Sequence, residues 1–260
     1  MTGGEKFTLK PDYQRSGAPY RDLRHLSTEV HEEQHMSGSV IARLGAAGAI
    51  AYGVMEILGD SLSSTTDSTQ TPQQIAAYFA AHSPTTLTWI GIYIETLGAF
   101  AFLLFGAYLW SVGRDRQEGR LLSILALSGG IVQAAVILAG EPPKIEAYFR
   151  ASQGMDPQLA AAMLDLNNAS FFLGFMPQAL LVAAAAGLAI RTGLFPSWLG
   201  WAGLGVAIAL LAVVAAPADS SLRVPVNLIF FVWLAVTGAV LLWRAPAAAV
   251  PALSNLPASV

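Results

Sequence analysis

Long apolar runs alternate with short polar segments along most of the chain. The hydrocarbon core of a membrane is about 30 Å thick, so a helix that crosses it needs roughly 20 predominantly apolar residues. Backbone N–H and C=O groups cannot stay unpaired in lipid, so each run should be helical. Six windows reach this length: residues 39–58, 87–110, 121–139, 159–190, 198–216 and 226–243. The pattern predicts an all-α, polytopic membrane helix bundle with six transmembrane helices.

The segments outside these windows are polar or rich in Ala and Pro. Residues 1–38 are polar and of mixed charge, and they predict a cytoplasmic N-terminal tail. Residues 39–244 form the predicted transmembrane domain. Residues 245–260 are rich in Ala and Pro, a composition typical of disorder, and predict a disordered cytoplasmic C-terminal tail.

The basic residues indicate the direction of the spans. Cytoplasmic loops of membrane proteins carry an excess of Lys and Arg. Of the 14 Lys and Arg residues, only Lys144, Arg150 and Arg223 fall on the side opposite to the N-terminus. The basic side is therefore predicted to be cytoplasmic, with both termini there. Tryptophans prefer the membrane interface, and four of them fall at this predicted inner boundary: Trp110, Trp198, Trp201 and Trp243.

Composition supports a membrane protein and excludes several chemistries. The chain is 54% hydrophobic and 12% charged, against about 25% charged residues in soluble domains. The net charge of −3 is too small to indicate a nucleic-acid partner. Cysteine is absent, which excludes disulfides, thiol catalysis and thiolate metal sites. The lipid bilayer is the predicted partner, and the predicted location is a bacterial cytoplasmic membrane.

Two outer loops carry similar sequences at a fixed offset. Six of ten positions are identical between residues 72–81 and residues 142–151. Each copy predicts a short amphipathic helix in an outer loop, with Thr71 as the N-cap of the first and Pro72 at its first position. The same offset relates Glu95 to Asp165, so the first two hairpins of spans are predicted to be internal repeats with the two carboxyl groups at similar depth. The alternative is chance similarity between two amphipathic segments.

The motif Pro-x-x-Ile-Ala-x-Tyr-Phe-x-x-His, from Pro72 to His82, lies between a Gly- and Ala-rich first span and an aromatic second span that ends in a basic loop. In these features the chain resembles a broad group of bacterial, largely actinobacterial, multi-pass membrane proteins of unassigned function. The resemblance is best over residues 40–120. It implies a membrane location and carries no activity.

Polar residues in or near the spans form the first candidate site. A carboxylate inside a membrane is costly unless it is paired, hydrated or protonated, which makes Glu95 a functional candidate. We expect an outer-leaflet polar pocket for a ligand or a proton, with Gln133 and Gln178 extending it inward. Its predicted members are Glu56, His82, Glu95, Asp165, Asn167 and Asn168. The alternative is that these groups satisfy one another and fix helix packing.

The second candidate is a metal site in the N-terminal tail. His31, Glu32 and His35 fit the pattern H-E-x-x-H, which on a helix places two imidazoles on one face with a Glu beside them, as in zinc hydrolases. The surrounding sequence is polar and short, whereas a metalloprotease helix is packed in a core. Weak zinc binding, or a solvated helix without metal, is the alternative, and no other cofactor is indicated.

Three functions follow from these features. The first is a non-enzymatic membrane protein that binds or moves a small solute or ion through the polar pocket. The second is a structural or accessory subunit, whose loop helices would dock another membrane protein or a second copy of the chain. The third is a zinc-dependent membrane hydrolase that uses residues 31–35. The sequence favours the first and indicates no other catalytic residues.

Overall fold

The structure is a computed structural model. It describes residues 22–63, 65–66, 69–151, 153–216 and 221–244, with side chains from Val40 onward except that of Ala151. The chain divides into two units, residues 1–38 and 39–260, and all the packing that follows is within the second unit. The predicted N-terminal tail lies largely, and the C-terminal tail wholly, outside the described residues.

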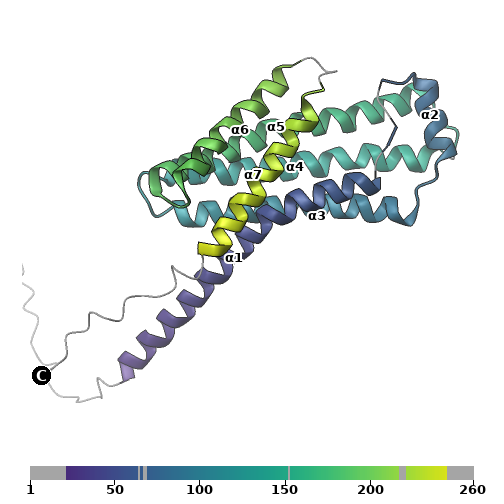
Figure 1. Cartoon of the computed structure of the whole chain (residues 1–260). Coiled ribbons are helices and arrows are strands. Elements are labelled where there is room, and N and C mark those ends of the chain that lie inside the picture. Colours follow the sequence, from purple (N-terminus) through teal and green to yellow (C-terminus); the bar gives the residue numbers. More distant parts are fainter. Residues whose placement is uncertain (1–21, 64, 67–68, 152, 217–220, 245–260) are drawn as a thin grey trace, which may run out of the picture. The chain divides into compact units, whose positions relative to one another are not determined.

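Six helices in the described part of the chain are long and apolar enough to cross a membrane. No strand occurs among the described residues. The prediction of an all-α fold with six membrane-spanning helices is thus confirmed, and the chain is a multi-pass membrane protein. The helices, labelled in Figure 1, are α1 (Asp22–Ser63), α3 (Thr86–Gly113), α4 (Arg120–Ala151), α5 (Pro157–Thr192), α6 (Ser197–Ala215) and α7 (Arg223–Arg244).

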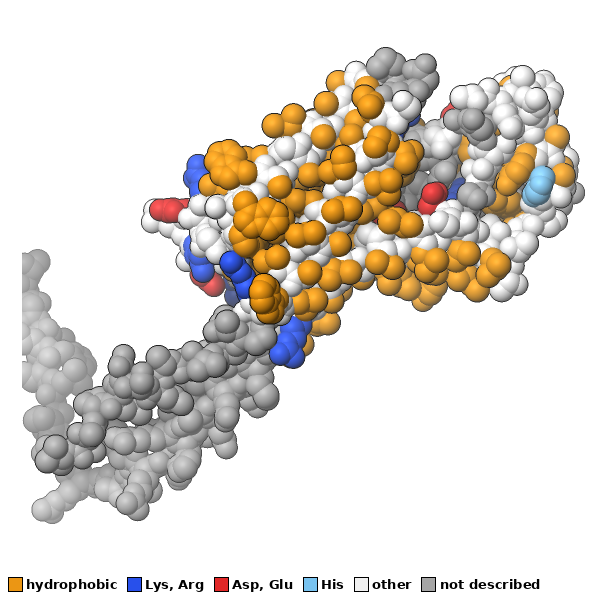
Figure 2. Space-filling view, in the orientation of Figure 1, with side chains coloured by type: hydrophobic (Ala, Val, Ile, Leu, Met, Phe, Trp, Pro, Cys, Tyr) orange, Lys and Arg blue, Asp and Glu red, His pale blue; other side chains and the backbone are white. Residues whose placement is uncertain are grey.

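The outward faces of these helices are apolar. Large hydrophobic side chains are exposed along every long helix, among them Leu44, Phe100, Ile131, Leu180, Ile208 and Val232. In Figure 2 hydrophobic side chains are spread over the whole visible surface of the bundle, and most charged side chains lie at one end of it or in one hollow. Such a surface is unfavourable in water and matches lipid, so the helices contact the bilayer.

The short helix α2 (Pro72–Ala81) connects α1 to α3. Thr71 is its N-cap and forms a capping box with Gln74, and Pro72 occupies the first turn, as predicted. Its apolar side is buried against α4 and α5. Ile75 and Phe79 pack there with Tyr148 and Leu164, and the rings of Phe79 and Tyr148 meet edge to face with centroids 5.0 Å apart.

The second predicted loop helix is helical but is not separate. Residues 142–151 continue α4 without a break, although Pro142 and Pro143 lie inside the helix. A proline removes a backbone hydrogen bond, and within membranes neighbouring helices compensate for such losses. The carbonyl groups that Pro142 and Pro143 leave without a helical donor are those of Leu138 and Ala139, four residues earlier. In the next position, Asn167 of α5 donates its Nδ2 to the carbonyl oxygen of Gly140, at 2.8 Å, and so joins α5 to this part of α4. Helix α4 therefore extends past the predicted end of the third span at residue 139.

Glycines bring α1 very close to α3. A Cβ built on Gly59 would lie 2.5 Å from Cγ of Glu95 and 2.9 Å from the carbonyl oxygen of Gly91. A Cβ on Gly91 would in turn lie 2.9 Å from Cβ of Ser63. Small residues permit this approach of two backbones in lipid. The close crossing places Ser63 and Glu95 side by side.

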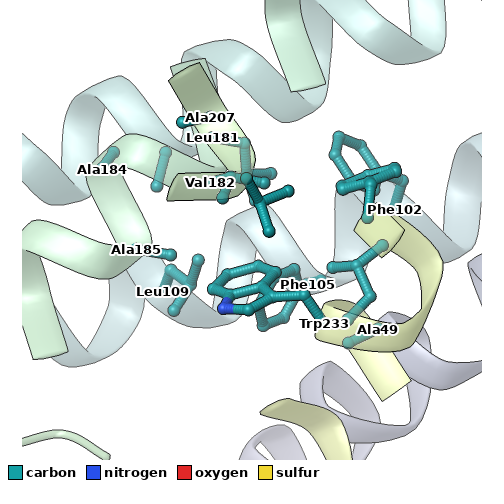
Figure 3. Close-up of a cluster of buried hydrophobic side chains, with 14 of the residues drawn as sticks. Ala49, Phe102, Phe105, Leu109, Leu181, Val182, Ala184, Ala185, Ala207 and Trp233 are labelled. Carbon is teal, nitrogen blue, oxygen red and sulfur yellow. The ribbon is translucent and has the colours of Figure 1, made fainter. Parts of the chain in front are cut away.

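The small residues of α1 at positions 45, 49 and 53 pack against two neighbouring helices. Gly45 packs on Tyr108 of α3, whereas Gly53 packs on Phe231 of α7. All six long helices contribute side chains to one large apolar core. Figure 3 shows part of this core, with the Trp233 indole beside Phe105 and Leu109. The indole Nε1 donates to the carbonyl oxygen of Leu199 at 3.0 Å, so its one polar atom is satisfied.

Candidate binding site

A polar cavity of about 410 Å³ lies between α1, α3, α4, α5 and α7. It occupies the half of the bundle in which α1 and α4 end and α3, α5 and α7 begin. Figure 2 shows a hollow there, with acidic and basic atoms visible inside it. We call this space the polar cavity. Its polar lining residues are Tyr52, Glu56, Asp60, Ser61, Thr65, Glu95, Gln133, Glu141, Lys144, Asn167, Asn168, Ser170, Gln178 and Asn227.

A buried ion pair joins three helices at the cavity. Lys144 Nζ of α4 lies 3.3 Å from Glu95 Oε2 of α3, and each residue is only 6% exposed. Ser63 Oγ of α1 donates to Glu95 Oε1 at 2.7 Å and accepts from Lys144 Nζ at 2.8 Å. A carboxylate and an ammonium group can remain buried when they are paired and hydrogen-bonded in this way.

Further acidic groups share this single lysine. Glu141 Oε2 lies 3.9 Å from Lys144 Nζ but has no hydrogen-bond partner. Glu56 Oε1 is also buried without a hydrogen-bond partner, and it lies against Gly98, where a Cβ would be 2.9 Å away. Asp60 is exposed at the rim. In formal charge, the cavity lining therefore carries more carboxyl groups than cationic groups, and the acidic excess favours a cation.

Beyond Glu56, the innermost polar residues of the cavity are uncharged. Tyr52 of α1 accepts hydrogen bonds from Gln133 Nε2 of α4 and Gln178 Nε2 of α5, both at 3.2 Å. Eight residues separate Tyr52 from Asp60, which places the tyrosine about 12 Å deeper along α1. Behind it the fully buried Phe102 and Phe230 pack against the Tyr52 ring. The core thus closes the cavity on this side.

The structure brings most of the predicted pocket residues together. Glu56, Glu95, Asn167 and Asn168 all line the polar cavity, and so do the two glutamines. His82 does not; it follows α2, is exposed and stacks on Tyr78. Asp165 is exposed and is also outside the lining.

Sequence reasoning missed the charged lining residues Asp60, Glu141 and Lys144. It also missed Ser63, which is hydrogen-bonded to the ion pair beside the cavity. Lys144 was assigned to a loop helix and counted only for its charge. Two features of the sequence could have indicated Lys144. It lies three residues after Glu141, directly after an apolar span, and Glu95 within the second span needs a cation as its partner. Using this signal required knowing that α4 continues through two prolines.

The two hairpins that were predicted to be equivalent differ at two pairs of corresponding residues. Phe79 is 2% exposed, whereas Phe149, at the corresponding position of the second copy, is 56% exposed. Glu95 is buried in an ion pair, whereas Asp165 is exposed. The two similar segments pack against each other through Phe79 and Tyr148. The expectation that Glu95 and Asp165 share one site therefore has no support in this geometry.

The candidate metal residues lie in the stretch of α1 whose side chains are outside the described residues. These are His31, Glu32 and His35, and their backbone is helical. Elsewhere, the part of the chain with described side chains contains no group of three or more His, Asp or Glu residues arranged to hold a metal ion.

Comparison with known proteins places the chain in a family. No curated protein and no solved structure matches it. A family model described as a domain of unknown function, DUF4386, matches residues 47–246. The match covers most of the 260 residues, including all six helices in whole or in part and the entire polar cavity. The chain therefore belongs to the DUF4386 family.

Proposed function

We propose that this protein binds a small organic cation in the polar cavity. The observation that carries the proposal is the charge imbalance: Glu56, Asp60, Glu95 and Glu141 face a single Lys144. A buried carboxyl oxygen without a hydrogen-bond partner is costly, and a cationic ligand beside Glu56 and Glu141 relieves that cost. Because Lys144 is already held by Glu95 and Ser63, it does not reach every acid.

The size and the walls of the cavity favour an organic molecule over a bare ion. Ligand pockets typically measure about 300–1,000 Å³, and this one measures about 410 Å³. Apolar side chains of α4, α5 and α7 complete the lining, including Val136, Ile137, Phe171 and Phe231. They offer a surface to the carbon skeleton of a ligand whose charge lies against the acids.

The proposed orientation puts the polar cavity on the outer side of a bacterial cytoplasmic membrane, with both termini in the cytoplasm. Trp198, Trp201 and Trp243 lie at the opposite end of α6 and α7 and are strongly exposed, as expected at a membrane interface. The buried core behind Tyr52 closes the path through the bundle. The geometry therefore supports binding from one side as the first step, whether or not transport follows.

The docking alternative has less support. It needs the apolar faces of the loop helices to be available to a partner. In the structure Ile75 and Phe79 are buried against α4 and α5, so the apolar stripe of α2 is already covered. The two prolines and residues up to 151 belong to a spanning helix rather than to a second loop helix.

Thermal unfolding of the full chain in detergent tests the proposal. We expect n-butylammonium and tetramethylammonium to raise Tm in a concentration-dependent way, and n-butyrate to have no such effect. Glu56→Gln removes a charge from the cavity and should abolish the increase. Asp165→Asn removes a charge from the exposed surface nearby and should preserve it. Equal responses to cation and anion, or an unchanged response in Glu56→Gln, would overturn the proposal.

A further inference from the structure

The inner end of the polar cavity contains hydrogen-bond acceptors that lack donors. Gln133 and Gln178 are 3% and 4% exposed, and each uses its Nε2 on the Tyr52 hydroxyl. Their Oε1 atoms are both buried without a hydrogen-bond partner. Glu56, one turn along α1 from Tyr52, adds a third unpartnered oxygen. Two neutral amides and one carboxyl group thus present free acceptors around the same tyrosine.

No side chain among the described residues donates a hydrogen bond to these three oxygens. Each glutamine directs one N–H of its amide to the Tyr52 hydroxyl, and the other N–H makes no hydrogen bond to any of the three oxygens. Lys144 is eleven residues from Gln133 on the same helix, about 16 Å along the axis, and is held by Glu95 and Ser63. The three acceptors are therefore without a donor in this structure. A buried acceptor left unpaired is unfavourable, so a ligand that supplies donors to these oxygens gains affinity.

We propose that this inner end recognises the primary ammonium group of a small organic amine. The inference rests on the proposed function and specifies its ligand class. A primary ammonium carries three N–H donors, which matches the three free oxygens of Gln133, Gln178 and Glu56. Its positive charge is compatible with Glu56, and hydrogen bonds to charged groups are the stronger ones. A quaternary ammonium has the same charge and no N–H, so it leaves all three oxygens unpaired.

A glycine in α5 supports the position of one acceptor. A Cβ built on Gly174 would lie 3.2 Å from Nε2 and 3.3 Å from Oε1 of Gln133. The absence of a side chain at Gly174 lets the amide lie directly against the α5 backbone. Gly174→Ala therefore shifts the Gln133 amide without removing a polar group or changing the charge of the cavity.

The decisive experiment compares tert-butylammonium with tetramethylammonium by calorimetric titration of the full chain. The two cations have the same number of heavy atoms, the same shape and the same charge, and differ in N–H donors. We expect wild type to bind tert-butylammonium about ten-fold or more tightly than tetramethylammonium. The loss of one hydrogen bond between a charged group and a buried acceptor corresponds to roughly that factor in affinity. In Gln133→Leu and Gln178→Leu this preference should fall several-fold, with the affinity for tetramethylammonium nearly unchanged. Gly174→Ala should also reduce the preference for tert-butylammonium over tetramethylammonium.

The outcomes separate this inference from the proposed function. Equal affinity of wild type for both cations, with loss of both in Glu56→Gln, would overturn the primary-ammonium inference and leave cation binding intact. The same holds if the leucine variants keep the full preference, because ordered water would then satisfy the glutamines. If neither cation binds wild type, both proposals fail. Circular dichroism and size-exclusion profiles like those of wild type show that the variants are folded.

Discussion

Lys144 and Glu95 form a buried ion pair across α4 and α3, with Nζ and Oε2 3.3 Å apart and Ser63 of α1 hydrogen-bonded to both. Three helices from distant parts of the chain thus meet at one charged cluster. Because the cluster borders the polar cavity, the same residues hold the bundle together and set the charge that a ligand meets.

Removing the lysine alone should destabilise the protein strongly. Breaking a buried pair leaves an uncompensated charge, and this costs about 3–5 kcal/mol. We therefore expect Lys144→Met to lower the free energy of unfolding by that amount in chemical denaturation. Adding Glu95→Gln should recover part of the loss, because the remaining partner is then neutral. An additive double variant would show that the two groups are not coupled.

An exposed pair on the same helix provides the control for that prediction. Arg150 and Glu146 are roughly half exposed and form an i, i+4 pair. Such pairs contribute about 0–1 kcal/mol. Arg150→Met should therefore change the free energy of unfolding far less than Lys144→Met.

The close crossing of α1 and α3 should tolerate no side chain at Gly59. The neighbours of a Cβ there include backbone atoms of Gly91 and Glu95, which cannot rotate away. We expect Gly59→Ala to cost about 1–3 kcal/mol, as overpacking does, and to disturb the Ser63–Glu95 hydrogen bond. Gly205 of α6 has nothing within 4 Å of a built Cβ. Gly205→Ala should leave the free energy of unfolding unchanged or raise it by up to about 1 kcal/mol. Measurement of Tm for both variants tests this difference.

The two similar segments should respond differently to the same substitution. Phe79 is 2% exposed and packs on Tyr148. Phe79→Ala should therefore lower the free energy of unfolding by about 3–5 kcal/mol and speed hydrogen exchange in α2. Phe149 is 56% exposed and meets Trp89 at 5.5 Å between ring centroids. Phe149→Ala should lower the free energy of unfolding by only about 1 kcal/mol. Equal losses would instead support the equivalence of the two segments as repeats.

The proposed orientation can be tested directly because the chain has no cysteine. Gln73→Cys places a thiol on the exposed side of α2, and Glu118→Cys places one in the exposed basic loop between α3 and α4. A membrane-impermeant maleimide should label position 73 in intact cells and position 118 only after the membrane is opened. The reverse pattern would place the polar cavity on the cytoplasmic side.

Part of the polar cavity could be predicted from the sequence. A glutamate eight residues into an apolar span is unusual enough to be identified without a structure, and Asn167, Asn168 and Glu56 followed from their similar depth. Asp165 was included because of its spacing relative to Glu95, and the structure places it on the surface. Depth along a helix can be read from sequence position, but the direction of a side chain around the axis depends on the neighbours of that helix.

The sequence by itself determined the six helices, because the length of an apolar run and the need to pair backbone groups in lipid are local constraints. It also determined the capping of α2 by Thr71, which involves only adjacent residues. Only the tertiary structure decided that Lys144 continues a spanning helix and pairs with Glu95, 49 positions away, or that two glutamines converge on Tyr52. These contacts depend on how glycine-lined helices approach and rotate against one another. Helix rotation is a property of the whole bundle, so no local pattern in the chain specifies it.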